Sequence, residues 1–148
     1  MSRIKTQTPI IHTPSFKTYT IYGATLRTTL DDLGLKTPMA MLDKWYYYTD
    51  TEGWGNLLPD LLLKSDLYQS DKFDCDNFAL KAMTTSAERY ELNTMDFVIG
   101  DIPEGRHAFN MIYTGEDWLV FEPNIGFQLG GQAFPIGENG YKLEMVLV

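Results

Sequence analysis

The sequence is poor in cysteine and has no long hydrophobic run. Cys75 is the only cysteine among 148 residues, so an internal disulfide is excluded and no oxidising compartment is implied. No stretch approaches the roughly 18–20 consecutive apolar residues of a membrane-spanning helix. The first residues, Met1 to Thr6, lack the apolar run of a signal peptide. We therefore expect a protein that is cytoplasmic or is released without a signal peptide.

Positive charge is also scarce. Lysine and arginine number 12 against 20 aspartates and glutamates, and the net charge is −8. Nucleic acids and anionic membranes need a basic surface, so we expect neither as a partner. The chain length and a hydrophobic content of 44% suit one globular domain. We expect a single domain over residues 1–148, in which residues 1–20 form an extended arm or a first strand.

Hydrophobic periodicity divides the chain into a helical first part and a strand-rich second part. The clearest helix begins at Cys75, where Asp74 is a candidate cap, and runs to about Leu92. Weaker helical patterns cover 26–35, 37–48 and 57–63, with a break at 53–56. After Asn93 the pattern changes to period two or short apolar runs, which predict strands over 95–99, 108–114, 118–121 and 142–148. Helices followed by an antiparallel sheet give an α+β domain.

Cys75 falls at the first position of the predicted helix. That position aims the sulfur at free backbone N–H groups and at the positive end of the helix dipole, and both favour the thiolate. Asp74 and Asp76 oppose the thiolate by like-charge repulsion, so a nearby cation is needed. A lone cysteine is otherwise most often a small, inert, buried hydrophobic residue. The natural cation is a protonated histidine.

Only one of the two histidines lies in a patterned segment. His12 stands among Thr and Pro residues, whereas His107 begins an apolar strand after the turn 103–105. If the hairpin loop is placed within residues 114–116, two strand registers are possible, in which His107 lies opposite either Glu122 or Asn124. In both registers these side chains lie on the same face of the sheet as His107. We expect Glu122 to orient the imidazole, with Asn124 as the second choice. Asn110 is disfavoured because it points to the opposite face.

A thiol, an imidazole and a carboxylate in this layout are what a cysteine nucleophile requires. The thiol attacks as the thiolate, the imidazole removes its proton, and the third group orients the imidazole. An oxyanion hole would use the backbone N–H of Cys75 and one side-chain donor. Gln69 and Tyr68 are the candidates for that donor.

Three segments resemble the papain-like superfamily of cysteine peptidases, in the broad sense that includes transglutaminase-like proteins. They are Asp74-Cys75-Asp76-Asn77-Phe78-Ala79, Gly105-Arg106-His107-Ala108-Phe109-Asn110 and Glu122-Pro123. The pattern is most similar to the protease domain of the mushroom chimerolectin from Marasmius, and it spans about Gln69 to Asn124. The resemblance implies a papain-like α+β domain with N-terminal helices, in which the nucleophile helix packs on an antiparallel β-sheet.

The same resemblance implies roles and partners. Cys75 would be the nucleophile, His107 the general base and Glu122 the orienting group, and Gln69 stands six residues before the nucleophile, as glutamine does in papain. The chain would be a thiol peptidase that hydrolyses a peptide or isopeptide amide in a peptide or protein substrate through an acyl-enzyme. No cofactor is expected. The chimerolectin family is calcium-dependent, which would place Asp74 and Asp76 near a metal, although helix capping and solvation explain both carboxylates more simply.

Alternatives of two kinds stay open. The same residues resemble NlpC/P60 cell-wall peptidases, which usually show Asp-Cys-Ser-Gly where this chain has Asp-Cys-Asp-Asn, and a transglutaminase or deamidase would share the chemistry. The other alternative is a non-catalytic structural or binding module, because a fold can be kept for binding without its chemistry. Thiol reactivity separates the two kinds, since a catalytic Cys75 should be alkylated quickly at neutral or mildly acidic pH.

Overall fold

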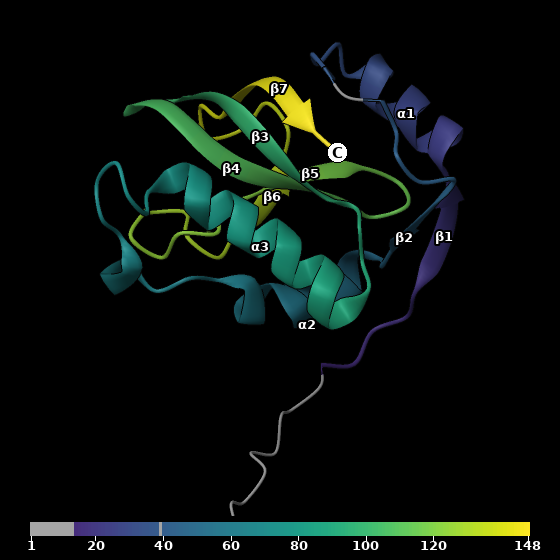
Figure 1. Ribbon diagram of the computed structural model, residues 1–148, viewed down its shortest axis with the longest axis horizontal. Coiled ribbons are helices and arrows are strands. Elements are labelled where there is room, and N and C mark those ends of the chain that lie inside the picture. Colours follow the sequence, from purple (N-terminus) through teal and green to yellow (C-terminus); the bar gives the residue numbers. More distant parts are fainter. Residues whose placement is uncertain (1–13, 39) are drawn as a thin grey trace, which may run out of the picture.

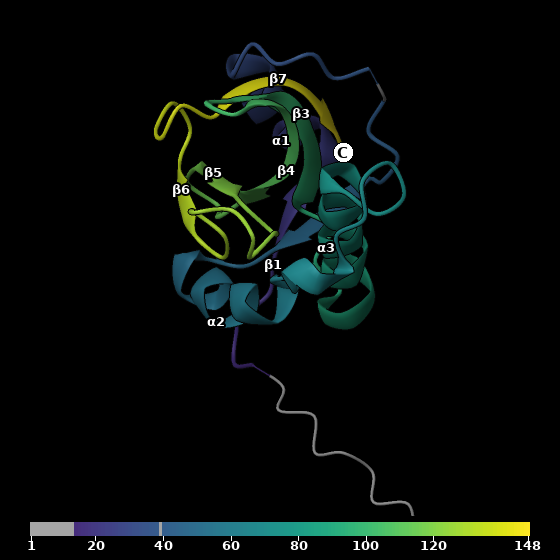
Figure 2. The same cartoon turned by 90° about the vertical axis from the view of Figure 1, so that its left-hand side faces the viewer.

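The computed structural model describes residues 14–38 and 40–148, which form two antiparallel sheets and three α-helices (Figures 1 and 2). His12 and most of the expected N-terminal arm lie outside the described residues. The elements, in chain order, are β1 (Tyr19–Tyr22), α1 (Gly23–Asp32), β2 (Trp45–Tyr48), α2 (Thr51–Leu61), a 3-10 turn η1 (Ser65–Leu67), α3 (Cys75–Tyr90), β3 (Met95–Ile102), β4 (Gly105–Tyr113), β5 (Trp118–Phe121), β6 (Ala133–Pro135) and β7 (Lys142–Leu147).

The larger sheet has five antiparallel strands in the order β6-β5-β4-β3-β7. Figure 2 shows that it is strongly curved. β3 and β4 pair without interruption from Met95 opposite Ile112 to Ile102 opposite Gly105, so a tight turn at residues 103–104 joins them. Hairpins of this kind connect neighbouring strands directly, which is why the sequence after Asn93 reads as successive short apolar runs.

Alternation along β4 separates two cores. Phe109 and Met111 point to one face of the sheet, where they pack with α1, while Ile112 points to the other face, where it packs with α2 and α3. All three side chains are fully buried. The first core also contains Leu26, Leu30, Val98, Val120 and Val146, and the second also contains Trp54, Leu57, Ala82 and Phe121.

Helix α3 is fixed at both ends and along its buried face. The backbone N–H of its N-cap, Asp74, donates to Oδ1 of Asn77 at 3.1 Å, as in a capping box. Its C-cap, Glu91, adopts a left-handed conformation with φ of 57°. The helix packs on β3 and β4, and the Asn110 side-chain amide of β4 donates to the carbonyl of Ala79 at 2.9 Å. These contacts hold the first residue of α3 beside the start of β4.

The region 37–48, expected as a helix, instead contains strand β2. Its residues Trp45 to Tyr48 pair with β1, with Tyr19 opposite Tyr48 and Tyr22 opposite Trp45. The Tyr19 and Tyr48 rings stack with centroids 5.5 Å apart. Consecutive aromatic residues favour a pleated strand with cross-strand ring contacts, and that preference outweighs the weak helical spacing.

Helix α2 begins at Thr51, earlier than expected, and includes the glycines read as a break. The Asp50 side chain caps it by accepting from the backbone N–H of Gly53 at 2.9 Å. A Cβ on Gly53 would lie 1.9 Å from Oγ1 of Thr49. Glycine at this position therefore allows close packing of the first helical turn against the Thr49 side chain, and it does not end the helix.

The papain-like arrangement expected from the sequence is corrected by this architecture. Instead of a set of N-terminal helices, the first part of the described chain has a two-stranded sheet with one helix inserted between its strands. The rest is a five-stranded antiparallel sheet with helices around it. The strands predicted at 95–99, 108–114, 118–121 and 142–148 correspond to β3, β4, β5 and β7, and β6 was not predicted. No helix among the described residues is long and apolar enough to cross a bilayer.

Candidate functional site

The site lies where the first turn of α3 meets the first residues of β4. Cys75 is the first residue of α3, and it is half-buried against Ala79, Phe97 and Ala108. Interactions with the ring of His107 and with the backbone N–H of Ala108 lower the pKa of its thiol. The helix start and the strand start thus bring together two residues that are far apart in the sequence.

Glu122 is completely buried and holds the other side of the His107 ring. Nε2 of His107, itself 4% exposed, donates to Oε2 of Glu122 at 2.7 Å. The same carboxylate accepts from the Tyr141 hydroxyl at 2.9 Å and from the backbone N–H of Asn124 at 3.0 Å. A buried carboxylate is tolerated only when donors replace its water, and these donors meet that condition.

Aromatic rings fix the orientation of His107. The Phe127 ring lies 4.4 Å from the imidazole centroid, and the Phe109 ring lies 5.9 Å from it. Because Nε2 is bonded to Glu122, Nδ1 is the nitrogen that remains for Cys75. The imidazole is therefore held between a carboxylate and a thiol with little freedom to rotate.

The electrostatics of this arrangement favour a thiolate–imidazolium pair. The hydrogen bond with His107 lowers the pKa of Cys75, against the opposing effect of burial, and the Ala108 N–H adds to the lowering. Burial alone would lower the pKa of His107, but the hydrogen bonds with Cys75 and Glu122 and the charges of both raise it to about 9. Two groups coupled in this way exchange a proton as a pair. The lowered pKa of Cys75 and the raised pKa of His107 both favour the charged form of the pair.

The two aspartates beside Cys75 interact with each other, and Asp74 also caps the start of α3. A hydrogen bond with Asp76 lowers the pKa of Asp74, and the same bond raises the pKa of Asp76. Oδ2 of Asp74 also accepts from the backbone N–H of Asp71 at 3.1 Å. Among the described residues no group of three or more His, Cys, Asp or Glu side chains is placed to hold a metal ion.

The two remaining expected residues take different places. Asn124 reaches the site through its backbone N–H, while its side-chain oxygen accepts from the N–H of Gly126 at 2.8 Å. Gln69 forms a tight backbone hairpin with Phe73, with N–H to carbonyl distances of 2.7 and 2.8 Å, and its side chain is exposed. Tyr68, the other candidate donor, is 49% exposed.

The strand register explains how Glu122 reaches His107. Tyr113 lies opposite Trp118 and Asn110 opposite Phe121, which corresponds to the second of the two expected registers. Glu122 follows the last paired residue of β5 and approaches His107 diagonally, and diagonal neighbours on one face are within reach of long side chains.

Sequence reasoning missed Tyr141 and Phe127. Tyr141 is 5% exposed, and burial together with the charge of Glu122 raises the pKa of its hydroxyl, which therefore stays protonated as a donor. Phe127 lies in the segment between β5 and β6. The only local signal for Tyr141 is its position directly after the turn at Asn139-Gly140 and before the last strand.

No protein-family model matches this chain, and no curated protein sequence matches it. Several solved structures are similar in fold, among them two complexes. One is a PSL1a–E64 complex, with a TM-score of 0.65 and 21% identity over 87% of this chain and 51% of that chain. The other is Polyporus squamosus lectin bound to the human-type influenza-binding epitope Neu5Acα2-6Galβ1-4GlcNAc, with a TM-score of 0.64 and 20% identity over 87% of this chain and 49% of that chain.

The chain shares its fold with these structures. It spans about half of their length, and at this identity the likeness concerns the fold. The identification with papain-like cysteine peptidases, and with the protease domain of the Marasmius chimerolectin, is corrected by this finding. The expectation of a thiol peptidase acting on a peptide or protein substrate is not borne out by this finding, since the shared fold is that of a lectin structure bound to a glycan. Short motifs at a helix start and a strand start are compatible with more than one function.

Proposed function

We propose that the protein is a ligand-binding module, and that its ligand binds at the start of α3 against the Cys75–His107 pair. The observation that carries the site is the buried hydrogen bond between Glu122 and the His107 ring, together with the effect of that ring on the pKa of the neighbouring Cys75 thiol. Burying the Glu122 carboxylate beneath a charged Cys75–His107 pair costs free energy when the protein folds. This cost is explained if the pair contacts a ligand.

Each residue of the site has a separate role in this proposal. The Cys75 thiolate is a charged acceptor for hydroxyl or amide groups of the ligand, and hydrogen bonds to charged groups contribute about 1.5–3 kcal/mol each. His107 keeps the thiol ionised, and Glu122 keeps His107 protonated and oriented. Asn124 holds Glu122 through its backbone N–H. Gln69 is exposed in the turn before α3, and in this proposal its side chain contacts the ligand.

We propose a glycan as the ligand. Two observations support this class: the shared fold with a lectin solved with a bound sialylated trisaccharide, and a charged acceptor that suits a ligand rich in hydroxyl groups. Because the chain spans about half of that lectin and is 20% identical to it, the glycan specificity of this chain needs its own test.

The test is binding of the full chain to immobilised glycans, among them Neu5Acα2-6Galβ1-4GlcNAc, before and after alkylation of Cys75 with iodoacetamide. The single cysteine makes the modification unambiguous. We expect glycan binding by the unmodified protein, and a large loss after alkylation and in His107→Ala. Thr84→Ala, on the exposed side of α3, is the matched control and should bind as the wild type does.

Three outcomes would contradict the proposal. Absence of binding to every glycan at high protein concentration would overturn the ligand class. Equal binding before and after alkylation would remove Cys75 from the site. Turnover of any substrate that is lost in Cys75→Ala would show that the site is not a simple binding site.

A further inference from the structure

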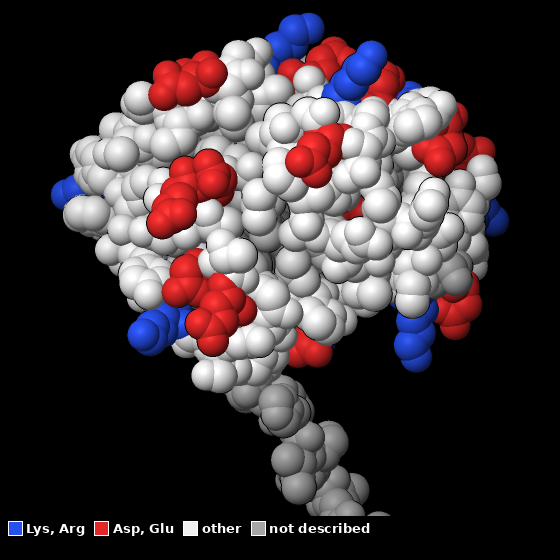
Figure 3. All heavy atoms as spheres, turned by 180° about the vertical axis from the view of Figure 1, so that it is seen from behind, with Lys and Arg blue, Asp and Glu red and all other residues white. Residues whose placement is uncertain are grey.

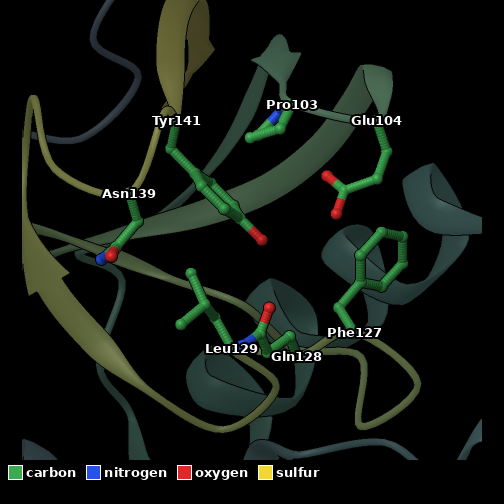
Figure 4. A pocket seen from close by; sticks show the side chains of 7 residues that line it. All are labelled: Pro103, Glu104, Phe127, Gln128, Leu129, Asn139 and Tyr141. Carbon is green, nitrogen blue, oxygen red and sulfur yellow. The ribbon is translucent and has the colours of Figure 1, made fainter.

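A pocket of about 170 Å³ lies beside the site, where three connecting segments meet (Figure 4). The first is the turn between β3 and β4, the second is the segment between β5 and β6, and the third is the turn before β7. A Cβ on Gly140 would lie 2.9 Å from Cγ of Pro103, so the first and third segments are in direct contact. The lining residues are Pro103, Glu104, Phe127, Gln128, Leu129, Asn139 and Tyr141.

The pocket shares two of its walls with the site. Tyr141 lines it and also donates from its hydroxyl to Glu122 at 2.9 Å. Phe127 lines it and also packs on the His107 ring at 4.4 Å. A group bound in the pocket therefore contacts the residues that hold the imidazole.

The lining combines hydrogen-bonding groups with apolar surfaces. Glu104, Gln128, Asn139 and the Tyr141 hydroxyl are polar, and Figure 4 shows that the Glu104 carboxylate and the Tyr141 hydroxyl both point toward the space between the walls. Phe127 and the other lining residues are apolar. None of the described lining residues is a lysine or arginine. Such a mixture fits a small, uncharged group with many hydroxyls, and Glu104 repels an anion.

We propose that this pocket is a subsite for one neutral sugar unit of the ligand that binds beside Cys75, and that Glu104 excludes acidic sugar units. This inference rests on the proposed function. It predicts a preference for units such as galactose or N-acetylglucosamine over Neu5Ac, although all three occur in the epitope bound by the similar lectin. A carboxylate on the ligand would be repelled by the Glu104 carboxylate at this short range.

The experiment is an NMR titration of the full chain with methyl galactoside, N-acetylglucosamine and Neu5Ac, each added as the free monosaccharide. The ring signals of His107, Tyr141 and Phe127 are followed. We expect the two neutral sugars to shift these signals and Neu5Ac to leave them unchanged. In Glu104→Gln, binding of Neu5Ac should become measurable, and Asn139→Ala should weaken binding of the neutral sugars several-fold.

Glu138→Gln is the control, because it removes the same charge from the neighbouring turn before β7, at a residue that does not line the pocket. It should behave as the wild type does. If Glu138→Gln admits Neu5Ac as well as Glu104→Gln does, the effect is one of overall charge and the subsite is overturned. If no neutral sugar shifts the signals at saturating concentration, the subsite is also overturned.

Failure of this inference is distinguishable from failure of the proposed function. Glycan binding that is lost on alkylation of Cys75, without any shift of the pocket signals, would refute the subsite alone. If the neutral sugars shift the pocket signals equally before and after alkylation, the pocket binds sugar independently of Cys75.

Discussion

At the scale of single residues, the site depends on how a carboxylate and an imidazole are kept inside the protein. Glu122 has no exposure to solvent, and its charge is balanced by donors from His107, Tyr141 and the Asn124 backbone. Removing one partner of a buried charged group leaves the other without compensation, which costs more than the bond itself contributes. Together with the interaction with Cys75, the hydrogen bond and the charge of Glu122 therefore support protonated His107.

Replacing Glu122 by Gln should lower the pKa of His107 from about 9 toward its ordinary value, because the carboxylate charge is lost. The free energy of unfolding should fall by about 1–3 kcal/mol, since an amide cannot accept from all the donors. The histidine pKa is measured by NMR and the stability by urea unfolding. Tyr141→Phe, which removes one donor and keeps the charge, should leave the pKa of His107 raised. An unchanged His107 pKa in Glu122→Gln would contradict this account.

Asp96 presents a second buried carboxyl, outside the site. It is fully buried, neither oxygen has a hydrogen-bond partner among the described residues, and burial raises its pKa well above the ordinary value of 3.8. Because the pKa of Asp96 is higher in the folded state than in the unfolded state, its contribution to the free energy of unfolding is fully present only below about pH 3.8. That contribution is lost as the pH rises toward the folded-state pKa, by up to about 1.4 kcal/mol per pH unit.

Asp96→Asn should therefore be more stable than the wild type at pH 7, because asparagine has no proton to lose in the unfolded state. The difference should shrink as the pH approaches 4. Urea unfolding at pH 4.5 and pH 7 measures both free energies. Parallel pH dependence of the two proteins would show that Asp96 does not titrate on unfolding.

At the scale of secondary structure, the first turn of α3 both caps the helix and places the thiol. Asp74 closes the turn through its bonds with Asn77 and Asp71, while its charge raises the pKa of Cys75. The two effects oppose each other, and substitutions separate them. Asp74→Asn keeps a capping side chain and removes the charge, whereas Asp74→Ala removes both.

We expect both Asp74 variants to alkylate faster than the wild type at pH 6, because less negative charge faces the thiolate. Only Asp74→Ala should also lower the midpoint of thermal unfolding. The measurement is mass-spectrometric alkylation together with a thermal scan. Slower alkylation in Asp74→Asn would mean that the aspartate supports the thiolate by some contact other than its charge.

Sequence reasoning worked best where one element carries its own signal. The α3 start and the strands β3, β4, β5 and β7 follow from a cap and from clear periodicity, and they bring Cys75, His107 and Glu122 together. Strands β1 and β2 depend on each other across an intervening helix, and β6 is too short to show a pattern. Tyr141 and Phe127 reach the site only through the topology of the sheet, and the turn before Tyr141 does not by itself show that its hydroxyl approaches Glu122.

At the scale of the whole molecule, acidic residues outnumber basic ones and the net charge is −8. Figure 3 shows Asp and Glu in separate groups on the face behind that of Figure 1, with Lys and Arg mostly at its edges. Such a surface repels anionic ligands over a distance of about 10 Å at 0.1 M salt. Neutral ligands are unaffected.

Binding of neutral glycans should accordingly be independent of ionic strength, whereas binding of sialylated glycans should strengthen between 20 mM and 500 mM salt, as screening at roughly 0.1 M and above reduces the repulsion. Titrations of one neutral and one sialylated glycan at both salt concentrations measure this. A sialylated glycan that binds more weakly at high salt would indicate a basic contact in the binding site.

The most direct test of the central claim is the rate of Cys75 alkylation by iodoacetamide as a function of pH, in the wild type and in His107→Ala. An ordinary thiol with a pKa of roughly 8.5 is only about 0.3% ionised at pH 6. If the thiolate–imidazolium pair exists, the wild type reacts at pH 6 far faster than an ordinary thiol, and His107→Ala loses that reactivity at pH 6 but much less at pH 9. Equal rates of the two proteins at pH 6 would show that Cys75 and His107 are not coupled, and the proposed site would not exist.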